Sequence, residues 1–247
     1  MNFKYISEIK RQLARLEQEG AANMQLAVEL LTDTILAKRS IFGFGASHAG
    51  ILIEELYYRA GGLVVFNPIF GRELMLDTVP VSRTSQMERL VGYGETLLQD
   101  VPIKEGDVLL AHSVSGRNPV TLEIAAGARA AGAKVIAVTN VEYSKSVTSR
   151  HPSGKRLFEL ADIVLDNYGH IGDACIELPG TKQKVAATST VIGATILNAI
   201  VAQVAEELIA KGVAVPPIFY SANIDGGDQL NRGVYREFGD SVHYRFV

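Results

Sequence analysis

The chain contains one cysteine and no tryptophan among its 247 residues. A single thiol cannot form an internal disulfide, which excludes the class of small secreted proteins that depend on disulfide frameworks. We interpret Cys175 as a small core side chain rather than a reactive nucleophile. The absence of disulfides fits a reducing compartment, so we expect a cytoplasmic protein.

The sequence also lacks an excess of charge of one sign. Its 24 lysines and arginines and 27 aspartates and glutamates give a formal net charge of −3, and the basic residues are scattered along the chain. Proteins that bind nucleic acids or membrane surfaces through charge carry basic clusters. We therefore expect neither nucleic acid nor membrane as a partner.

No segment has the character of a signal peptide or the length of a membrane span. The first twenty residues, MNFKYISEIKRQLARLEQEG, are charged and follow a helical pattern. The most apolar stretch, residues 191–204, is interrupted by Asn198 and Gln203. It is shorter than the roughly 20 apolar residues that a membrane helix needs. We expect a soluble protein.

Two helices are predicted before residue 39. Ile6, Ile9, Leu13 and Leu16 recur at the spacing of an amphipathic helix, which Gly20 is expected to end. A second apolar stripe follows, formed by Ala27, Leu30, Leu31, Thr34 and Ile35. Residues 1–39 are therefore expected to form an N-terminal helical segment.

Five short apolar runs alternate with helical segments in the rest of the chain. The runs lie at 40–45, 63–66, 107–112, 134–139 and 162–166. Each run is β-branched or leucine-rich and does not alternate between apolar and polar residues, which is typical of strands buried on both faces. Helical patterns lie at 47–60, 119–131 and 191–210. The alternation predicts an α/β fold with a five-stranded, parallel, doubly wound sheet of flavodoxin-like order 2-1-3-4-5, joined by right-handed crossovers.

Two segments do not follow this pattern. Residues 67–99 combine prolines, glycines and a polar run, and a connection of about 30 residues often serves as a lid or a partner-contacting loop. Residues 212–247 are rich in Pro, Gly, Asn and Asp and close with aromatic residues. We expect this tail to pack on the α/β domain, residues 40–211, or on a partner subunit.

Loops rich in glycine and serine follow the first and the third predicted strand. The first strand runs into GFGASH at 43–48, and the third into HSVSGRNP at 112–119. Gly45 and Gly116 allow close backbone approach, and Ser47, Ser113 and Ser115 offer hydroxyl groups. Free amides at a helix start favour an anion such as phosphate. In the expected strand order both loops meet at the switch point, where ligands bind.

Two other interpretations of these loops have to be considered against the phosphate site. Serine at a helix start also serves as a cap or a turn residue. One serine satisfies that need, whereas the second loop has two, with a glycine and Asn118; Ser47 alone fits either role. A nicotinamide site is disfavoured because His48 replaces the third glycine of that motif, and the second strand ends in Phe66 and Asn67 without an acid.

The sequences around both loops resemble a known family. SVSGRN at 113–118, followed by PVTLE and GARAAGAKVIAVTN, is similar to the phosphate loop of the sugar isomerase (SIS) domain family. GFGASH and EELYYRAGGL resemble the family's first loop and helix, and ATSTV at 187–191 resembles a late segment. The resemblance covers residues 26–211, and the whole chain is similar to stand-alone SIS proteins that carry the label phosphoheptose isomerase.

The resemblance implies a sugar-phosphate ligand and names its contacts. The phosphate would be held by Ser113, the Val114 amide, Ser115, Gly116 and Asn118, the last in place of the family's usual Thr or Ser. The sugar would be contacted by Gly45, Ser47, His48, Thr188, Ser189 and Thr190. The family also implies a homodimer or a dimer of dimers with sites near the interface, which the N-terminal helices are candidates to form.

Aldose–ketose isomerisation needs a base that moves a proton between adjacent carbons. Glu55 lies on the flank of the predicted helix 47–60, and its ELYYR pattern resembles that around the catalytic glutamate of phosphoheptose isomerases. The alternative is an ion pair between Glu55 and Arg59, four residues apart. His170, in a polar loop after the fifth strand, is a second catalytic candidate, with a structural or exposed role as its alternative.

A bound metal is not expected, and no other cofactor is either. Metal-assisted members of the family place a histidine one turn before the glutamate, where this chain has Ile51, and the late helix has no histidine. Three functions remain open: a sugar-phosphate isomerase, a non-catalytic sugar-phosphate sensor, and a lyase or etherase acting on amino-sugar acids. The last would use a second acid such as Glu123 or Asp173.

Overall fold

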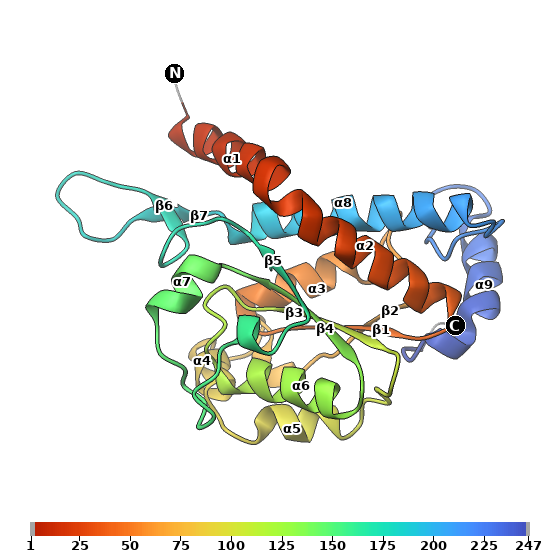
Figure 1. The fold of residues 1–247 in the computed structure, drawn as a ribbon, viewed down its shortest axis with the longest axis horizontal. Coiled ribbons are helices and arrows are strands. Elements are labelled where there is room, and N and C mark those ends of the chain that lie inside the picture. The colour runs from red at the N-terminus through yellow and green to blue at the C-terminus, as the bar shows by residue number, and fades with distance from the viewer. Residues whose placement is uncertain (1–2, 246–247) are drawn as a thin grey trace.

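A computed structural model describes residues 3–245 and contains a five-stranded parallel sheet (Figure 1). The order is β2-β1-β3-β4-β5, which confirms the predicted fold and strand order. The strands are β1 (Ile41–Gly45), β2 (Phe66–Pro68), β3 (Val108–His112), β4 (Lys134–Thr139) and β5 (Ile163–Asp166). Gly45 at the end of β1 pairs in register with His112 at the end of β3. The two glycine- and serine-containing loops therefore leave the sheet side by side.

Helices cover both faces of the sheet, because its strands are apolar on both sides (Figure 1). Ile41, Leu110 and Ile136 point to one face, into a core shared with α2, α3 and α8. Phe42, Leu109 and neighbouring strand residues point to the other face, where α6 and side chains from α5 pack. The bounds are α2 (Ala21–Leu36), α3 (Ile51–Leu56), α5 (Tyr93–Leu98), α6 (Pro119–Ala130) and α8 (Ser189–Ala210).

Gly20 does not end the first helix, contrary to the expectation. The N-terminal helix α1 (Lys4–Arg15) continues through one π-helical turn (Leu16–Gly20) into α2. Gly20 keeps a right-handed helical backbone, and a Cβ placed on it would lie 2.7 Å from Cδ1 of Leu16. The glycine thus makes room for a packed leucine instead of stopping the helix.

The predicted helix 47–60 is shorter than expected. A 3-10 turn (Ser47–Gly50) leads into α3, which ends at Leu56 because Tyr57 is extended. A Cβ on Gly45 would lie 2.5 Å from the carbonyl oxygen of Ala49, so Gly45 is required for this turn to close against β1. Gly45 therefore contributes to the site by allowing the backbone conformation of the first loop.

Helix α8 has 22 residues, so the expectation that this apolar stretch is too short to span a membrane is wrong by length. Its exclusion as a membrane span rests on packing instead. Ile192, Ile196 and Ile200 are at most 2% exposed, and the helix packs on α2 and α3. α8 therefore packs as a core helix of the α/β domain.

The connection 67–99 forms short helices that cover α6. They are a 3-10 turn (Arg72–Leu74), α4 (Ser82–Glu88) and α5. Two further elements were not expected from the sequence: α7 (Val141–Ser146), and a hairpin of β6 (Ala174–Ile176) and β7 (Val185–Ala187) that extends from the body near α1 (Figure 1). A 3-10 turn (Leu157–Glu159) precedes β5.

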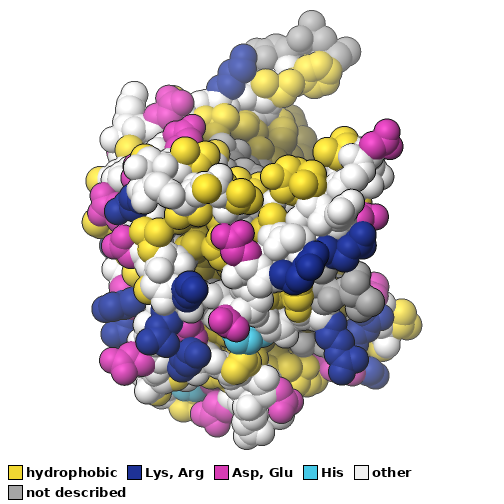
Figure 2. Space-filling view, turned by 90° about the vertical axis from the view of Figure 1, so that its right-hand side faces the viewer, with side chains coloured by type: hydrophobic (Ala, Val, Ile, Leu, Met, Phe, Trp, Pro, Cys, Tyr) yellow, Lys and Arg dark blue, Asp and Glu magenta, His cyan; other side chains and the backbone are white. Residues whose placement is uncertain are grey.

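The C-terminal segment folds beside β2. It forms α9 (Gly227–Phe238) and a 3-10 turn (Gly239–Ser241), and buries Phe219, Val234 and Val242 around Val64. The Tyr244 hydroxyl donates to the Val64 carbonyl at 2.6 Å. The face that α9 covers carries positive and negative side chains interspersed (Figure 2). The second strand is displaced from the predicted 63–66 to 66–68, and Leu63 instead bridges to Ile218 of this segment.

Candidate functional site

A cavity of about 260 Å³ lies at the carboxyl ends of β1 and β3, between the two loops. The predicted residues that line it are Ser47, His48, Ser113, Val114, Ser115 and Asn118. The lining also contains Glu88, His112, Tyr143 and Asp173. The structure thus brings together the first loop, residues 43–48, and the loop of residues 112–119, called the serine loop below, as the strand order predicts.

Hydrogen bonds from Thr139, the last residue of β4, and from Asn140 after it hold the carbonyl groups of the serine loop. The hydroxyl of Thr139 donates to the carbonyl of Ser113 at 2.7 Å, and the Asn140 amide donates to the carbonyl of Val114 at 3.0 Å. Among residues 3–245, nothing accepts from the backbone N–H of Val114 or Ser115. The loop therefore fixes its carbonyls toward β4 and keeps two amide donors available.

The two serines of this loop differ in their contacts. Ser113 is 8% exposed, and its hydroxyl oxygen accepts from the Gly116 amide at 3.2 Å, which is the contact of a turn residue. Gly116 makes that turn with φ of +58° and does not line the cavity. Within the described part of the chain the Ser115 hydroxyl has no hydrogen-bond partner. Turn formation thus accounts for Ser113 but not for Ser115.

Asn118 and Glu88 form a polar pair on the wall of the cavity. The side-chain amide of Asn118 donates to Oε2 of Glu88 at 2.5 Å, and its carbonyl accepts from Arg150 at 2.9 Å. Asn118 precedes α6 but its side chain does not cap that helix. Burial raises the pKa of the Glu88 carboxyl, against the opposing hydrogen bond from Asn118. Glu88 lies in the irregular 67–99 connection, where no motif indicated it.

Three arginines lie close together beside Asn118. Burial, followed by the nearby charges of Arg117 and Arg89, lowers the pKa of the Arg150 guanidinium. The amide of Arg150 also donates to the carbonyl of Arg117 at 2.9 Å. Their combined field favours an anion at this end of the cavity.

Thr188, Ser189 and Thr190 do not line the cavity. They lie at the start of α8, where Asp173 accepts from the Ser189 amide at 2.9 Å and from its hydroxyl at 2.6 Å. Asp173 also accepts from the Thr188 amide at 3.2 Å. Asp173 lines the cavity, so Thr188 and Ser189 position a carboxylate of the cavity wall without lining the cavity themselves.

Glu55 and His170, the two catalytic candidates, lie outside the cavity lining. Glu55 forms an ion pair with Arg59, the alternative weighed for it, and accepts from Asn198 at 3.2 Å. His170 contacts Glu8 of α1 at 2.8 Å between Nε2 and Oε1. Within one chain both side chains have partners elsewhere, and their catalytic roles stay predictions.

Glu123, one of the two acids considered for a lyase, is also committed elsewhere. Its carboxylate accepts from the backbone amides of Gly92 and Gly94, at 2.6 and 2.8 Å. It is 3% exposed and anchors the start of α5 on α6. No group of three or more His, Cys, Asp or Glu side chains within residues 3–245 is arranged to hold a metal ion.

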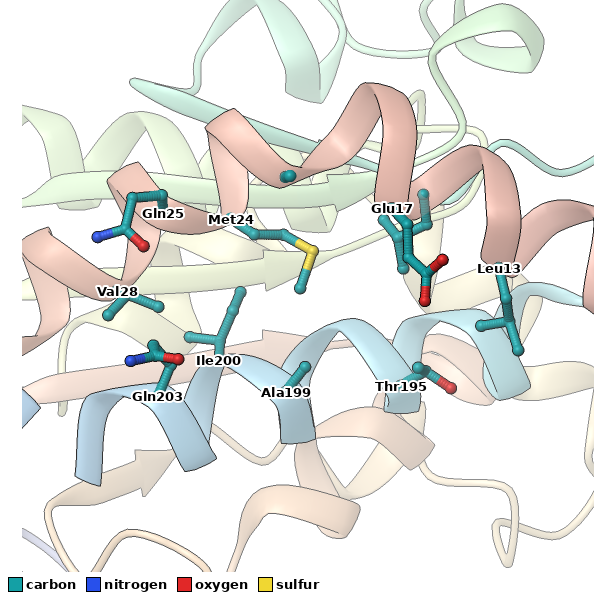
Figure 3. A pocket seen from close by; sticks show the side chains of 11 residues that line it. Leu13, Glu17, Met24, Gln25, Val28, Thr195, Ala199, Ile200 and Gln203 are labelled. Atoms are coloured by element: carbon teal, nitrogen blue, oxygen red, sulfur yellow. The ribbon is translucent and has the colours of Figure 1, made fainter. Parts of the chain in front are cut away.

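A larger hollow of about 480 Å³ lies between the N-terminal helices and α8 (Figure 3). Apolar side chains of Leu13, Met24, Val28 and Ile200 form much of its wall. The described residues that line it include no lysine or arginine. Its chemistry does not suit a phosphate ester, unlike that of the smaller polar cavity.

The comparisons with known proteins agree with this architecture. A family model described as the SIS domain matches residues 4–140, more than half of the chain. The chain therefore belongs to the SIS-domain family. A UPF0309 protein of Shouchella clausii is 48% identical over 241 residues, and one of Oceanobacillus iheyensis is 46% identical over 241 residues; each alignment covers 98% of both chains.

Two solved structures of phosphoheptose isomerases share the fold. That from Francisella tularensis has a TM-score of 0.56 at 13% identity and covers 82% of this chain and 95% of its own. GmhA from Neisseria gonorrhoeae has a TM-score of 0.50 at 16% identity and covers 84% and 96%. At these identities the likeness shows a common fold, and the chemistry of this chain has to be argued from its own cavity.

Proposed function

We propose that this chain binds a phosphorylated sugar or amino sugar in the cavity between the two loops and isomerises it by aldose–ketose chemistry. The observation that carries the proposal is that the backbone amides of Val114 and Ser115 and the Ser115 hydroxyl, which lie next to each other, have no hydrogen-bond partner among residues 3–245. Such donors are suited to the oxygens of a phosphate. The arginines near Asn118 add positive potential at the same end.

The isomerase part of the proposal also rests on family membership. Glu55 is the proposed base, by its resemblance to the glutamate of phosphoheptose isomerases. In one chain it is paired with Arg59 and lies outside the lining, so the proposal includes a homodimer in which the site is completed near the subunit interface. The proposed setting is the cytoplasm, where Cys175 stays a free thiol.

A panel of phosphorylated sugars tests binding and turnover separately. Fructose 6-phosphate, glucosamine 6-phosphate and sedoheptulose 7-phosphate are compared with the unphosphorylated sugars by thermal shift. Turnover is followed in D2O by the incorporation of deuterium next to the carbonyl carbon, which an aldose–ketose isomerase catalyses. We expect stabilisation by phosphorylated members only, and deuterium incorporation into at least one of them.

The variant Glu55→Gln separates the roles within the site. It removes the base without removing the side-chain volume, so turnover should fall by at least about 100-fold while phosphate-dependent stabilisation remains. Turnover that survives this change would remove Glu55 as the base. Binding without turnover in the unmodified protein would reject the isomerase and leave the sensor, the second candidate function.

A further inference from the structure

His112 is the last residue of β3 and lies at the junction of the two loops. It is 1% exposed, lines the cavity, and pairs in register with Gly45 of β1. The sequence places His112 directly before the SVSGRN motif, but that motif assigns no role to the histidine. What it contributes depends on which of its two ring nitrogens is free.

One nitrogen is fixed by a backbone carbonyl. Nδ1 of His112 lies 3.0 Å from the carbonyl oxygen of Ala49 in the first loop. A carbonyl oxygen only accepts, so Nδ1 must carry the hydrogen. Burial lowers the pKa of the His112 imidazole, and the Ala49 contact and the charge of Asp173 act in the opposite direction without outweighing it. The ring is therefore neutral near pH 7, with a bare lone pair on Nε2.

Nε2 has no hydrogen-bond partner among residues 3–245, although it is buried. An unsatisfied buried acceptor costs on the order of 1–3 kcal/mol. In the described chain neither serine of the adjacent loop donates to it: the only hydrogen bond of the Ser113 hydroxyl there is the one it accepts from Gly116, and the Ser115 hydroxyl has none. An incoming donor that enters the cavity would satisfy this nitrogen.

The phosphate group of an ester cannot be that donor, because its dianion carries no hydrogen and its oxygens only accept. A sugar hydroxyl can. We infer that Nε2 of His112 accepts a hydrogen bond from a hydroxyl group of the bound sugar, so that the cavity selects hydroxylated phosphate esters over a phosphate ester without a hydroxyl group. This inference rests on the proposed function, since the serine loop must hold the phosphate for the sugar to lie beside His112.

Two substitutions separate the two nitrogens. His112→Asn keeps an amide that can donate to the Ala49 carbonyl and removes the acceptor at the Nε2 position. His112→Gln places an amide group near the Nε2 position and so retains an acceptor there. The probes are fructose 6-phosphate, glucosamine 6-phosphate, sedoheptulose 7-phosphate and methyl phosphate, an ester that has no hydroxyl group as its dianion, with affinities measured by calorimetry. The melting temperature of each free variant reports whether it folds.

We expect at least one of the three sugar phosphates to bind the unmodified protein more tightly than methyl phosphate does. His112→Asn should lose about tenfold in affinity for that sugar phosphate and change its affinity for methyl phosphate less than twofold. His112→Gln should recover part of the loss. In 15N NMR spectra of the unmodified protein, the sugar phosphate should shift the Nε2 resonance of His112, and methyl phosphate should leave it in place.

The inference is overturned if no sugar phosphate binds more tightly than methyl phosphate, or if His112→Asn weakens binding of both kinds of ester equally. An Nε2 resonance that does not respond to the preferred sugar phosphate would overturn it as well, and this readout does not depend on the variants folding. Failure of the proposed function has a different signature. In that case methyl phosphate would not bind the unmodified protein, and Ser113→Ala with Ser115→Ala would leave binding of the sugar phosphates unchanged.

Discussion

The side-chain amide of Asn118 donates to Oε2 of Glu88 at 2.5 Å, which places a carboxyl group inside a cavity whose serine loop and neighbouring arginines favour anions. The pairing links the end of the serine loop to α4, a helix of the irregular 67–99 connection. Burial raises the pKa of Glu88, so protonation of this group comes at a higher pH than for an exposed glutamate. The charge state of Glu88 should therefore control anion binding.

Glu88→Gln should strengthen anion binding. Glutamine keeps an oxygen that can accept from Asn118 and removes the negative charge, so sulfate should bind roughly three- to tenfold more tightly at pH 7, about 1 kcal/mol. Sulfate is the better probe because, unlike phosphate, it does not titrate near neutral pH. Calorimetry from pH 7 to pH 4.5 should show that acidification strengthens sulfate binding less in the variant than in the unmodified protein. Equal pH profiles would contradict this role.

His112 should make stability depend on pH below neutrality. Because burial lowers its pKa, the unfolded chain binds a proton below the ordinary value of 6.5 while the folded chain does not. The stabilisation is complete above pH 6.5 and is lost as the pH falls toward the lowered pKa, with a slope of at most about 1.4 kcal/mol per pH unit. Urea unfolding of His112→Gln should show a shallower slope in this window.

In His112→Gln the free energy of unfolding should still depend on pH to some extent, because burial lowers the pKa of His243 too. In a double variant that also carries His243→Gln, the free energy of unfolding should depend on pH even less. If the slope below pH 6.5 is the same in the unmodified protein and in His112→Gln, the neutral state assigned to His112 is wrong.

Gly116→Ala should damage the serine loop. Gly116 has φ of +58°, and a Cβ there would lie 3.0 Å from the Ser144 hydroxyl oxygen and 3.2 Å from Cβ of Leu157. Backbone strain and crowding together should lower the free energy of unfolding by about 2 kcal/mol and weaken phosphate binding. Gly154→Ala is the matched control, with φ of +71° and open space around its Cβ. It should cost only about 1 kcal/mol and leave phosphate binding intact.

The placement of the two loops could be predicted because it depends on local sequence and on sheet topology. Buried strands before Ser47 and Ser113, together with the parallel order, fix both loops at one edge of the sheet. Glu88 could not be predicted in this way. Its position depends on how the short helices of the 67–99 connection pack over α6, and nothing in its local sequence records that packing.

Glycine misled the prediction where its role is tertiary. The local sequence at Gly20 predicts the end of a helix. In the structure the helix continues, and a glycine is needed there because Leu16 packs against it. The partners of Glu55 show the opposite case. The spacing to Arg59 predicts the observed ion pair, whereas the contact with Asn198 of α8 comes from the packing of α3 on α8.

The phosphate site at Val114 and Ser115 is tested most directly by titrating the protein with inorganic phosphate and recording its melting temperature. Ser115→Ala removes a hydroxyl without a partner in the described chain, so the free protein should keep its stability while the phosphate-dependent shift becomes smaller. Ser113→Ala with Ser115→Ala should abolish the shift, and Ser7→Ala, an exposed control on α1, should retain it. A folded double variant with an unchanged shift would contradict the account.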